Sequence, residues 1–427
     1  MDNKIISSLK CKFPGCEYTP LGDDKDKYCI FHSKNPKKDR NLFREKFQKL
    51  IDDEKTALPR YSHYYSIDGF TFPEDFDFPE SLSKLSMQFK NCTFNGRFNI
   101  FARILFGRIF FLRCTFKSKV IFIDSDFEKY VFFSECIFII GLQLIGCRFN
   151  AFMIKRSEIE VHFYIQYSQF HYWFQFGQNK LVKNCPFILI GINFDISKRV
   201  QIYGTNLMNA FFFNCMISRI EFFEIEWKKG KDGRYLISNE NFEIKYSENP
   251  KSELIPDGIE FLIGKKDTYT ESVENIYSQL SKAYEKNSLF LAAERFYISK
   301  MEIRRERKKN WFKRYVFSPE ALYKIFSDYG TSIKKTLAWI LGIFFIFSIL
   351  IQCASTGFSF DFFWSFSLKD FCQYFKMNLI QIIYPLDLAK GTPDVVYLLF
   401  GMERLFLISL MAFFLLSLKR RFREVNY

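Results

Sequence analysis

The sequence predicts a mainly β chain that ends in an α-helical membrane region. Three observations carry this prediction: a cysteine and histidine cluster near the start, an eleven-residue repeat rich in Phe, and two long apolar stretches near the end. In chain order we expect a small cysteine-containing module over residues 1–60, a parallel β-helix solenoid with a cap and linker over 61–267, a helical hairpin with a basic segment over 268–333, and two transmembrane helices within 334–427.

The first module contains four residues with the spacing of a metal site. The segment Cys11–His32 reads CKFPGCEYTPLGDDKDKYCIFH, so C-x4-C is followed after twelve residues by C-x2-H. Tetrahedral zinc needs four soft or borderline donors, which two tight turns can supply. We therefore predict a structural Zn²⁺ held by Cys11, Cys16, Cys29 and His32, the alternative being four unconnected residues that share this spacing. With four protein ligands, no position remains for a catalytic water.

The chain is basic, with a formal net charge of +14, which suggests an anionic partner such as nucleic acid or an acidic membrane surface. Three lysines follow the cluster, Lys34, Lys37 and Lys38. They could contact nucleic acid, but a solvated face is the more ordinary interpretation. The first ten residues lack the apolar core of a signal peptide, so we expect the soluble part to face the cytosol and its cysteines to be reduced thiols.

A position usually occupied by a small residue recurs every eleven residues through the centre of the chain. An apolar residue, most often Phe, follows it two places later. An amphipathic helix also tolerates a period near eleven, but the local spacing of two and the β-forming residues favour strands. The register begins at Cys92, Arg103, Cys114, Ser125, Cys136 and Cys147, continues after a slip of one at Ser157 and Ser168, and returns more loosely at Cys185, Asn193, Thr205 and Cys215.

Self-similarity at a fixed period predicts a stacked solenoid, in which two units form a coil of about 22 residues. Cys or Ser then supplies a small inward residue beside stacked Phe. We accordingly interpret these cysteines as packing residues rather than metal ligands.

After the repeat, residues 228–267 are weakly patterned and are expected to form a cap and linker. From Ser272 the spacing becomes helical, which predicts a hairpin that couples the solenoid to the membrane. Its first stripe is Val273, Ile276, Tyr277, Leu280 and Tyr284, and its second is Leu289, Ala293, Phe296 and Tyr297.

The segment Arg304–Arg314, RRERKKNWFKR, has seven basic residues and one acidic residue. Aromatic residues interrupt the charges, as in a juxtamembrane helix on anionic lipid. The expected lipid contacts are Arg304, Arg305, Arg307, Lys308, Lys309, Trp311, Lys313 and Arg314. Nucleic acid would use the same residues, but the nearby apolar stretch favours lipid.

Two apolar stretches have the length of membrane spans. Thr336–Phe360 has no charged residue, and the second candidate, Leu399–Leu418, contains Glu403 and Arg404 near one end. The alternative for the first stretch is a helix buried in a large soluble core. Glu403 and Arg404 are candidate pore-lining or intramembrane polar residues.

Basic residues flank both spans on their outer sides, at Lys334 and Lys335 and again from Lys419 to Arg423. The positive-inside rule then predicts that both termini are cytoplasmic. The connecting segment, Asp361–Asp394, is rich in aromatic residues. A span, a short dipping helix and a second span would be the layout of a simple pore, but an interfacial loop is the favoured interpretation because no potassium-type filter is present.

The alternating small and Phe or Leu residues resemble those of pentapeptide-repeat proteins, which form right-handed parallel β-helices. Three segments, Ala293–Glu306, Asp328–Ile340 and Glu403–Arg423, look like parts of bacterial pentapeptide-repeat proteins with a two-span, ion-channel-like carboxyl terminus. The resemblance implies a bacterial inner-membrane location. Its channel-like members carry a Gly-Tyr-Gly filter where this chain has Tyr384-Pro385-Leu386, so potassium selectivity is not carried over.

No Gly-rich phosphate loop, nucleophile elbow or further metal cluster occurs in the sequence, which predicts a non-enzymatic protein. We expect a homo-oligomeric inner-membrane protein whose solenoid binds a partner, most readily a protein. Its paired transmembrane helices would form a pore or disrupt the membrane. Effectors of bacterial antiviral defence are the analogy. The alternatives are a static membrane-anchored scaffold and a nucleic-acid-binding adaptor.

Overall fold

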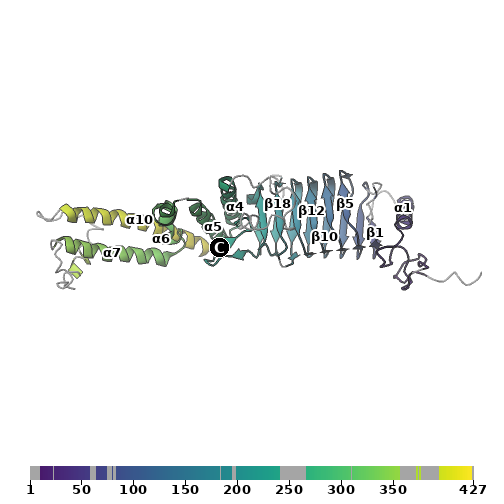
Figure 1. Ribbon diagram of the computed structural model, residues 1–427, viewed down its shortest axis with the longest axis horizontal. Coiled ribbons are helices and arrows are strands. Elements are labelled where there is room, and N and C mark those ends of the chain that lie inside the picture. Colours follow the sequence, from purple (N-terminus) through teal and green to yellow (C-terminus); the bar gives the residue numbers. More distant parts are fainter. Residues whose placement is uncertain are drawn as a thin grey trace, which may run out of the picture. The chain divides into compact units, whose positions relative to one another are not determined.

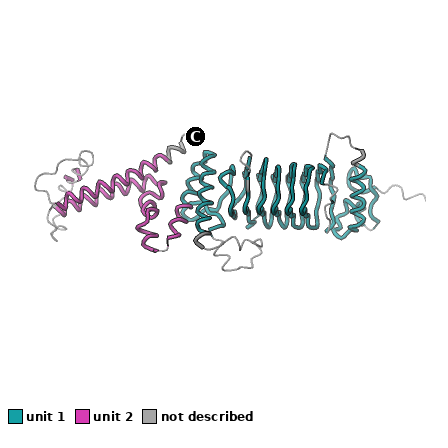
Figure 2. Tube along the Cα trace, turned by 90° about the horizontal axis from the view of Figure 1, so that it is seen from above, with its two compact units in different colours: residues 1–299 teal, residues 300–427 magenta. Residues whose placement is uncertain are grey.

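The computed structural model describes residues 10–22, 24–57, 64–74, 79, 83–182, 184–194, 199–240, 266–308, 310–355, 372–373, 375–376 and 394–425. The chain divides into two compact units, Met1–Ser299 and Lys300–Tyr427 (Figure 2). The first contains the predicted parallel β-solenoid and the second contains the predicted pair of apolar helices (Figure 1).

Three parallel sheets form the sides of the solenoid. The largest runs in the order β1 (Tyr65–Asp68), β3 (Met87–Lys90), β7 (Ile109–Leu112), β10 (Asp126–Ser134), β13 (Arg148–Lys155), β16 (Gln169–Gly177), β20 (Arg199–Tyr203) and β22 (Glu221–Phe223), with β6 (Ile104–Leu105) beside β10 and β19 (Asn193–Phe194) beside β16. The second contains β2 (Thr71–Phe72), β4 (Thr93–Phe94), β8 (Thr115–Phe116), β11 (Ile137–Phe138), β14 (Glu158–Ile159) and β17 (Lys180–Leu181). The third contains β5 (Phe98–Phe101), β9 (Val120–Ile123), β12 (Leu142–Ile145), β15 (Phe163–Gln166), β18 (Phe187–Ile190) and β21 (Ala210–Phe213).

The register of these strands confirms a coil of about two repeat units. Tyr65 pairs with Met87 and Met87 pairs with Ile109, each step being 22 residues. Val131 pairs with Phe152 after 21 residues, which accounts for the slip of one in the sequence pattern. The looser repeat beyond Ser168 corresponds to a longer coil, because Phe174 pairs with Val200, 26 residues later.

Stacked Phe rings fill the interior along the solenoid axis. Phe72, Phe94, Phe116 and Phe138 form one column, with successive ring centroids 4.4, 4.8 and 5.0 Å apart and nearly parallel planes. All four side chains are buried, and each comes from the same position of successive coils. The repeat therefore aligns large apolar side chains, whose burial is the main favourable contribution to folding.

Two helices follow the last coil, α4 (Lys266–Lys286) and α5 (Phe290–Glu306). The predicted stripe on α4 is buried, and Tyr284 stacks on Phe222 of β22 at 5.6 Å, so α4 covers the end of the solenoid. The prediction for Leu289 is wrong. It lies in the turn before α5 and is exposed, because the chain reverses through Ser288, whose φ is 59°. Of the predicted cap and linker, β23 (Lys228–Lys229) and β24 (Tyr235–Leu236) form a hairpin, and residues 241–265 lie outside the described part.

The second unit contains a short π-helix (Lys313–Phe317), α6 (Pro319–Ser327), α7 (Ile333–Ser355) and α10 (Asp394–Val425). Ile343 and Phe347 pack against Leu407 and Leu410, whereas Ile351, further along α7, packs against residues nearer the start of α10, Val396 and Phe400. The two helices are therefore antiparallel. Ile333–Ala354 and Asp394–Lys419 are long and apolar enough to cross a membrane. Most of the segment between them lies outside the described residues, including the last five residues of the first predicted span.

Candidate functional site

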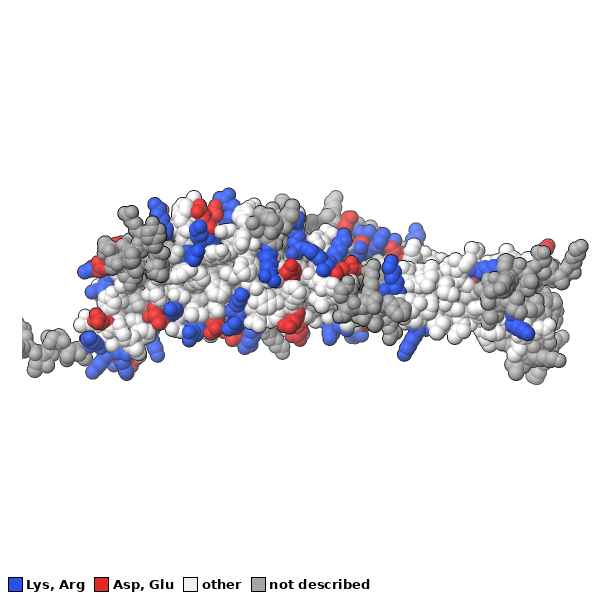
Figure 3. Space-filling model, turned by 180° about the vertical axis from the view of Figure 1, so that it is seen from behind, with Lys and Arg blue, Asp and Glu red and all other residues white. Residues whose placement is uncertain are grey.

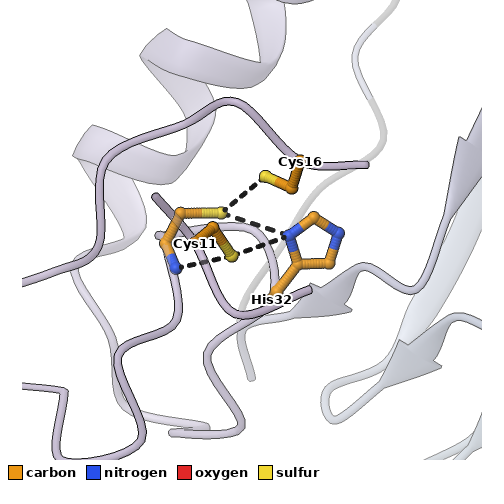
Figure 4. A group of neighbouring side chains, drawn as sticks. Cys11, Cys16 and His32 are labelled. Carbon is orange, nitrogen blue, oxygen red and sulfur yellow. Dashed lines mark hydrogen bonds between the residues drawn. The ribbon is translucent and has the colours of Figure 1, made fainter. Parts of the chain in front are cut away.

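The four predicted metal ligands lie together in the structure, with their donor atoms all within 4.8 Å of one another (Figure 4). The Sγ atoms of Cys16 and Cys29 are 3.7 Å apart, and Nδ1 of His32 is 3.6 Å from Sγ of Cys11 and 3.2 Å from Sγ of Cys29. None of these cysteines forms a disulfide. The chain brings Cys11–Cys16 and Cys29–His32 together as two turns, closed by hydrogen bonds from Cys16 N to Phe13 O and from His32 N to Cys29 O.

These separations fit a tetrahedral metal site. Metal–sulfur bonds of about 2.3 Å place two sulfur ligands about 3.8 Å apart along a tetrahedron edge. Two backbone amides, those of Cys29 and Phe13, also donate to Sγ of Cys11 at 3.3 and 3.5 Å. Such donors stabilise a thiolate. The donor set can therefore hold a metal ion.

His32 is oriented for this role by the solenoid. Its Nε2 lies 3.2 Å from the carbonyl oxygen of Asp68, at the end of β1. If Nε2 carries the proton and donates it to this carbonyl, Nδ1 has a free lone pair that faces the sulfurs, as metal-ligating histidines require. Phe13 stacks on the imidazole with ring centroids 3.9 Å apart. Burial lowers the pKa of His32, which favours the neutral ring that binds metal.

Burial has the opposite effect on two of the thiols. It raises the pKa of Cys29 to about 12 and also raises that of Cys16. Thiolates at these positions need a nearby positive charge, because a buried anion without one is strongly disfavoured. Binding of a cation would supply that charge and displace the thiol protons.

The sequence predicts that the three lysines after the cluster are solvated. This prediction is wrong for Lys38, although Lys34 and Lys37 are exposed. Lys38 is buried, and its Nζ donates to the carbonyl oxygens of Ser33 at 3.0 Å and Phe31 at 3.4 Å. The ammonium also lies 5.0 Å from the centre of the Phe43 ring. No repeat or spacing distinguishes Lys38 from its neighbours in the sequence, because its burial depends on the fold of the turn and of α1 (Arg40–Ala57).

The cysteine and histidine cluster lies against the first coil of the solenoid. Thr71 N donates to Phe31 O at 2.7 Å, and the rings of Phe31 and Phe70 stack at 4.5 Å. Phe43 and Phe47 of α1 also pack their rings near Phe72 of β2. The module and the solenoid thus share one aromatic core at this end.

The basic segment is partly occupied by internal ion pairs. Arg305, expected to contact lipid, is instead buried and pairs with Glu302 at 2.6 Å. Arg304 and Lys308 both lie near Glu320, at 3.3 and 3.8 Å, and Arg314 lies 3.8 Å from Glu306. Residues of the segment that are exposed in the described part include Arg307, Trp311, Phe312 and Lys313, whereas Lys309 lies outside it.

Sequence reasoning missed Glu302, a buried acid on α5. Its carboxylate accepts hydrogen bonds from Arg305, Lys324 and the hydroxyl of Tyr329. These partners come from α5, α6 and the turn before α7. Glu302 therefore joins α5 to α6 and to the turn before α7, and only its position among basic residues could have drawn attention to it.

The two candidate intramembrane polar residues differ in burial. Glu403 is 1% exposed and lies on the buried face of α10 between Phe400 and Leu407, whereas Arg404 is half-buried. Among the described residues, Oε1 of Glu403 has no hydrogen-bond partner. By register, the buried Ser348 and Gln352 of α7 lie at the same level of the helix pair. The seam between the apolar helices thus contains a carboxyl group.

Comparisons with known proteins are sparse. One similar protein, "Uncharacterized protein MJ1147" of Methanocaldococcus jannaschii, is 28% identical over 121 residues, which cover 27% of this chain and 26% of that protein. The match thus spans about a quarter of the relative's length. No protein-family model and no solved structure matches the chain, and the pentapeptide-repeat and ion-channel resemblances remain predictions.

Proposed function

We propose that this chain is a non-enzymatic membrane protein. Its apolar helices α7 and α10, called the membrane hairpin below, anchor a partner-binding solenoid and associate with those of further copies. The observation that carries the proposal is the apolar outer surface of the membrane hairpin. Leu341, Leu405 and Ile408 are among many large side chains of α7 and α10 that point away from the helix pair and are exposed. Figure 3 shows few charged side chains over this region, whereas both signs are interspersed over the solenoid. Lipid or further copies of the membrane hairpin would cover such a surface.

The antiparallel helices support a hairpin topology with both ends on one side of the membrane. The basic residues at the start of α7 and at the end of α10 then share one side, which the positive-inside rule assigns to the cytoplasm. The proposed location is a bacterial inner membrane with both termini cytoplasmic. Exposed Trp311, Phe312 and Lys313 suit contact with anionic lipid beside the membrane hairpin.

Zn²⁺ is the proposed occupant of the cysteine and histidine cluster, held by Cys11, Cys16, Cys29 and His32. Four protein donors make a structural site, so bound metal would fix the two turns rather than take part in a reaction. The turns lie on the first coil, and their role is to close the amino-terminal end of the solenoid. Terminal caps of this kind protect an otherwise open strand edge.

The surface of the solenoid offers a place for a protein partner. Phe101, Ile104 and Phe106 are large, exposed and close in sequence at one corner. Exposed apolar side chains that gather together mark interaction surfaces on soluble domains. Arg103 lies among them and Arg108 follows them in the sequence, so the proposed partner is a protein with an apolar and acidic surface; nucleic acid capture is less favoured.

The burial of Glu403 is the reason for proposing assembly. A carboxyl group buried among apolar side chains is costly unless it is paired or protonated. Assembly of several membrane hairpins into a pore would give it water or a polar group of another copy. A static scaffold that conducts nothing is the second candidate, favoured by the length of the solenoid relative to a two-helix membrane region.

The test is the mass of the detergent-extracted protein by light scattering, followed by ion flux from liposomes. We expect a defined oligomer with flux, and Glu403→Gln should reduce the flux because the carboxylate is lost. Ser409→Ala is the matched control, since Ser409 is exposed on α10 and its hydroxyl donates to the carbonyl oxygen of Leu405 in the same helix. An oligomer without flux would contradict the pore and favour the static scaffold. A monomer would contradict assembly.

A further inference from the structure

The cysteine and histidine cluster has a charge problem that its four ligands do not solve. Three thiolates and a neutral imidazole around a divalent cation carry one net negative charge. Cys11, Cys29 and His32 are all buried, so water compensates little of it. An uncompensated charge at such a site disfavours metal binding.

Lys38 is the residue placed to supply the missing positive charge. Within described residues 10–39, the other lysines are exposed and Lys38 is buried. Its ammonium hydrogen-bonds to the carbonyls of Phe31 and Ser33, the two residues that flank the ligand His32. It is thereby held against the turn that carries both Cys29 and His32.

The electrostatics agree with this geometry. Burial lowers the pKa of Lys38 to about 7, and the neighbouring Cys29 opposes the loss of the proton. The ammonium thus lies beside the turn that carries Cys29 and His32, although it coordinates nothing.

We infer that Lys38 is a positioning residue that neutralises the metal–thiolate centre and so strengthens metal binding by a three-cysteine, one-histidine ligand set. This inference rests on the proposed metal site. It assigns Lys38 an electrostatic role in addition to its hydrogen bonds with the turn. A lysine that only braced the turn would make the same hydrogen bonds but would be indifferent to the charge of the ligands.

The experiment measures Zn²⁺ affinity of the full-length protein in detergent, by competition with a chromogenic chelator, with Co²⁺ spectra to verify thiolate ligation. Lys38→Met should weaken binding about 10-fold to 100-fold, the usual effect of removing an outer partner of a metal site. Lys38→Arg should bind nearly as well as the unaltered protein. Lys37→Met, the exposed neighbour, is the matched control and should have no effect.

A double-variant cycle separates charge from packing. Cys16→His removes one negative charge at the half-exposed ligand, so the centre becomes neutral and Lys38→Met should cost much less affinity in that background. An equal loss in both backgrounds would overturn the electrostatic role, as would unchanged binding by Lys38→Met. If Lys38→Met does not fold, Lys38→Gln, which keeps a hydrogen-bond donor but has no charge, replaces it in both backgrounds, and the same comparison of the two losses decides. An unaltered protein that binds neither Zn²⁺ nor Co²⁺ would refute the proposed metal site itself, and this inference with it.

Discussion

At several corners of the solenoid, a small side chain, Cys or Ser, completes the hydrogen bonding. Sγ of Cys114 lies 3.6 Å from the carbonyl oxygen of Leu112 and 3.4 Å from that of Phe89 on the previous coil. Arg113, just before it, has a φ of 54°, which turns the chain into the corner. At the equivalent corner, Ser125 makes the same two kinds of contact with its hydroxyl. The recurring requirement is thus a small donor that satisfies corner carbonyls.

Replacement of Cys114 tests that requirement. We expect Cys114→Ser to leave the thermal unfolding midpoint of the full-length protein nearly unchanged, because Ser125 shows that a hydroxyl fits. Cys114→Leu should lower the free energy of unfolding by about 1–3 kcal/mol, since a larger side chain overpacks a fully buried position. Equal destabilisation by both variants would point to a specific need for the thiol.

At the scale of elements, Glu302 joins α5, α6 and the turn before α7. Burial disfavours its charge, but hydrogen bonds from Lys324 and Arg305 outweigh this effect and lower its pKa. A carboxyl whose pKa is lowered by folding contributes stability above its unfolded pKa, and this contribution disappears as the pH falls through the folded value. The network should therefore be intact at neutral pH and weaken in acid.

Glu302→Gln should destabilise the protein at pH 7 by about 3 kcal/mol, because it leaves the buried Arg305 and the partly exposed Lys324 without their counter-charge. The difference from the unaltered protein should shrink as the pH falls below about 4.3, where an ordinary glutamate is protonated. Thermal unfolding in detergent across this pH range measures both effects. Glu306→Gln, at an exposed ion pair with Arg314, is the control and should differ little at any pH.

At the scale of the whole molecule, the cysteine and histidine cluster and the first coil form one structural unit. The carbonyl of Asp68 orients His32, and the chain after β1 hydrogen-bonds to the turn that carries this ligand. Loss of order in the turns would expose the edge of β1 and the aromatic core beneath it. An open edge of a parallel sheet can pair with another chain.

Chelation of the metal should therefore make the detergent-solubilised protein aggregate through its solenoid, with time-dependent light scattering as the measurement. Cys11→Ser should behave in the same way without a chelator, because a ligand is lost. Cys92→Ser is the control, since this cysteine belongs to the coil corners rather than to the cluster. Unchanged scattering after verified metal removal would show that the cap holds without metal.

The sequence by itself determined the period of the solenoid, the spacing of the cysteine and histidine cluster and the two long apolar helices. Each depends on residue type at a fixed separation along the chain, which covalent geometry translates directly into a coil, a turn or a helix of given length. The tertiary structure decided which polar side chains are buried and what they contact. Lys38, Glu302 and Glu403 look like ordinary charged residues in the sequence, because their roles come from partners brought near by packing, such as Tyr329, 27 residues from Glu302. Burial and charge pairing depend on that long-range packing, and local spacing carries no record of it.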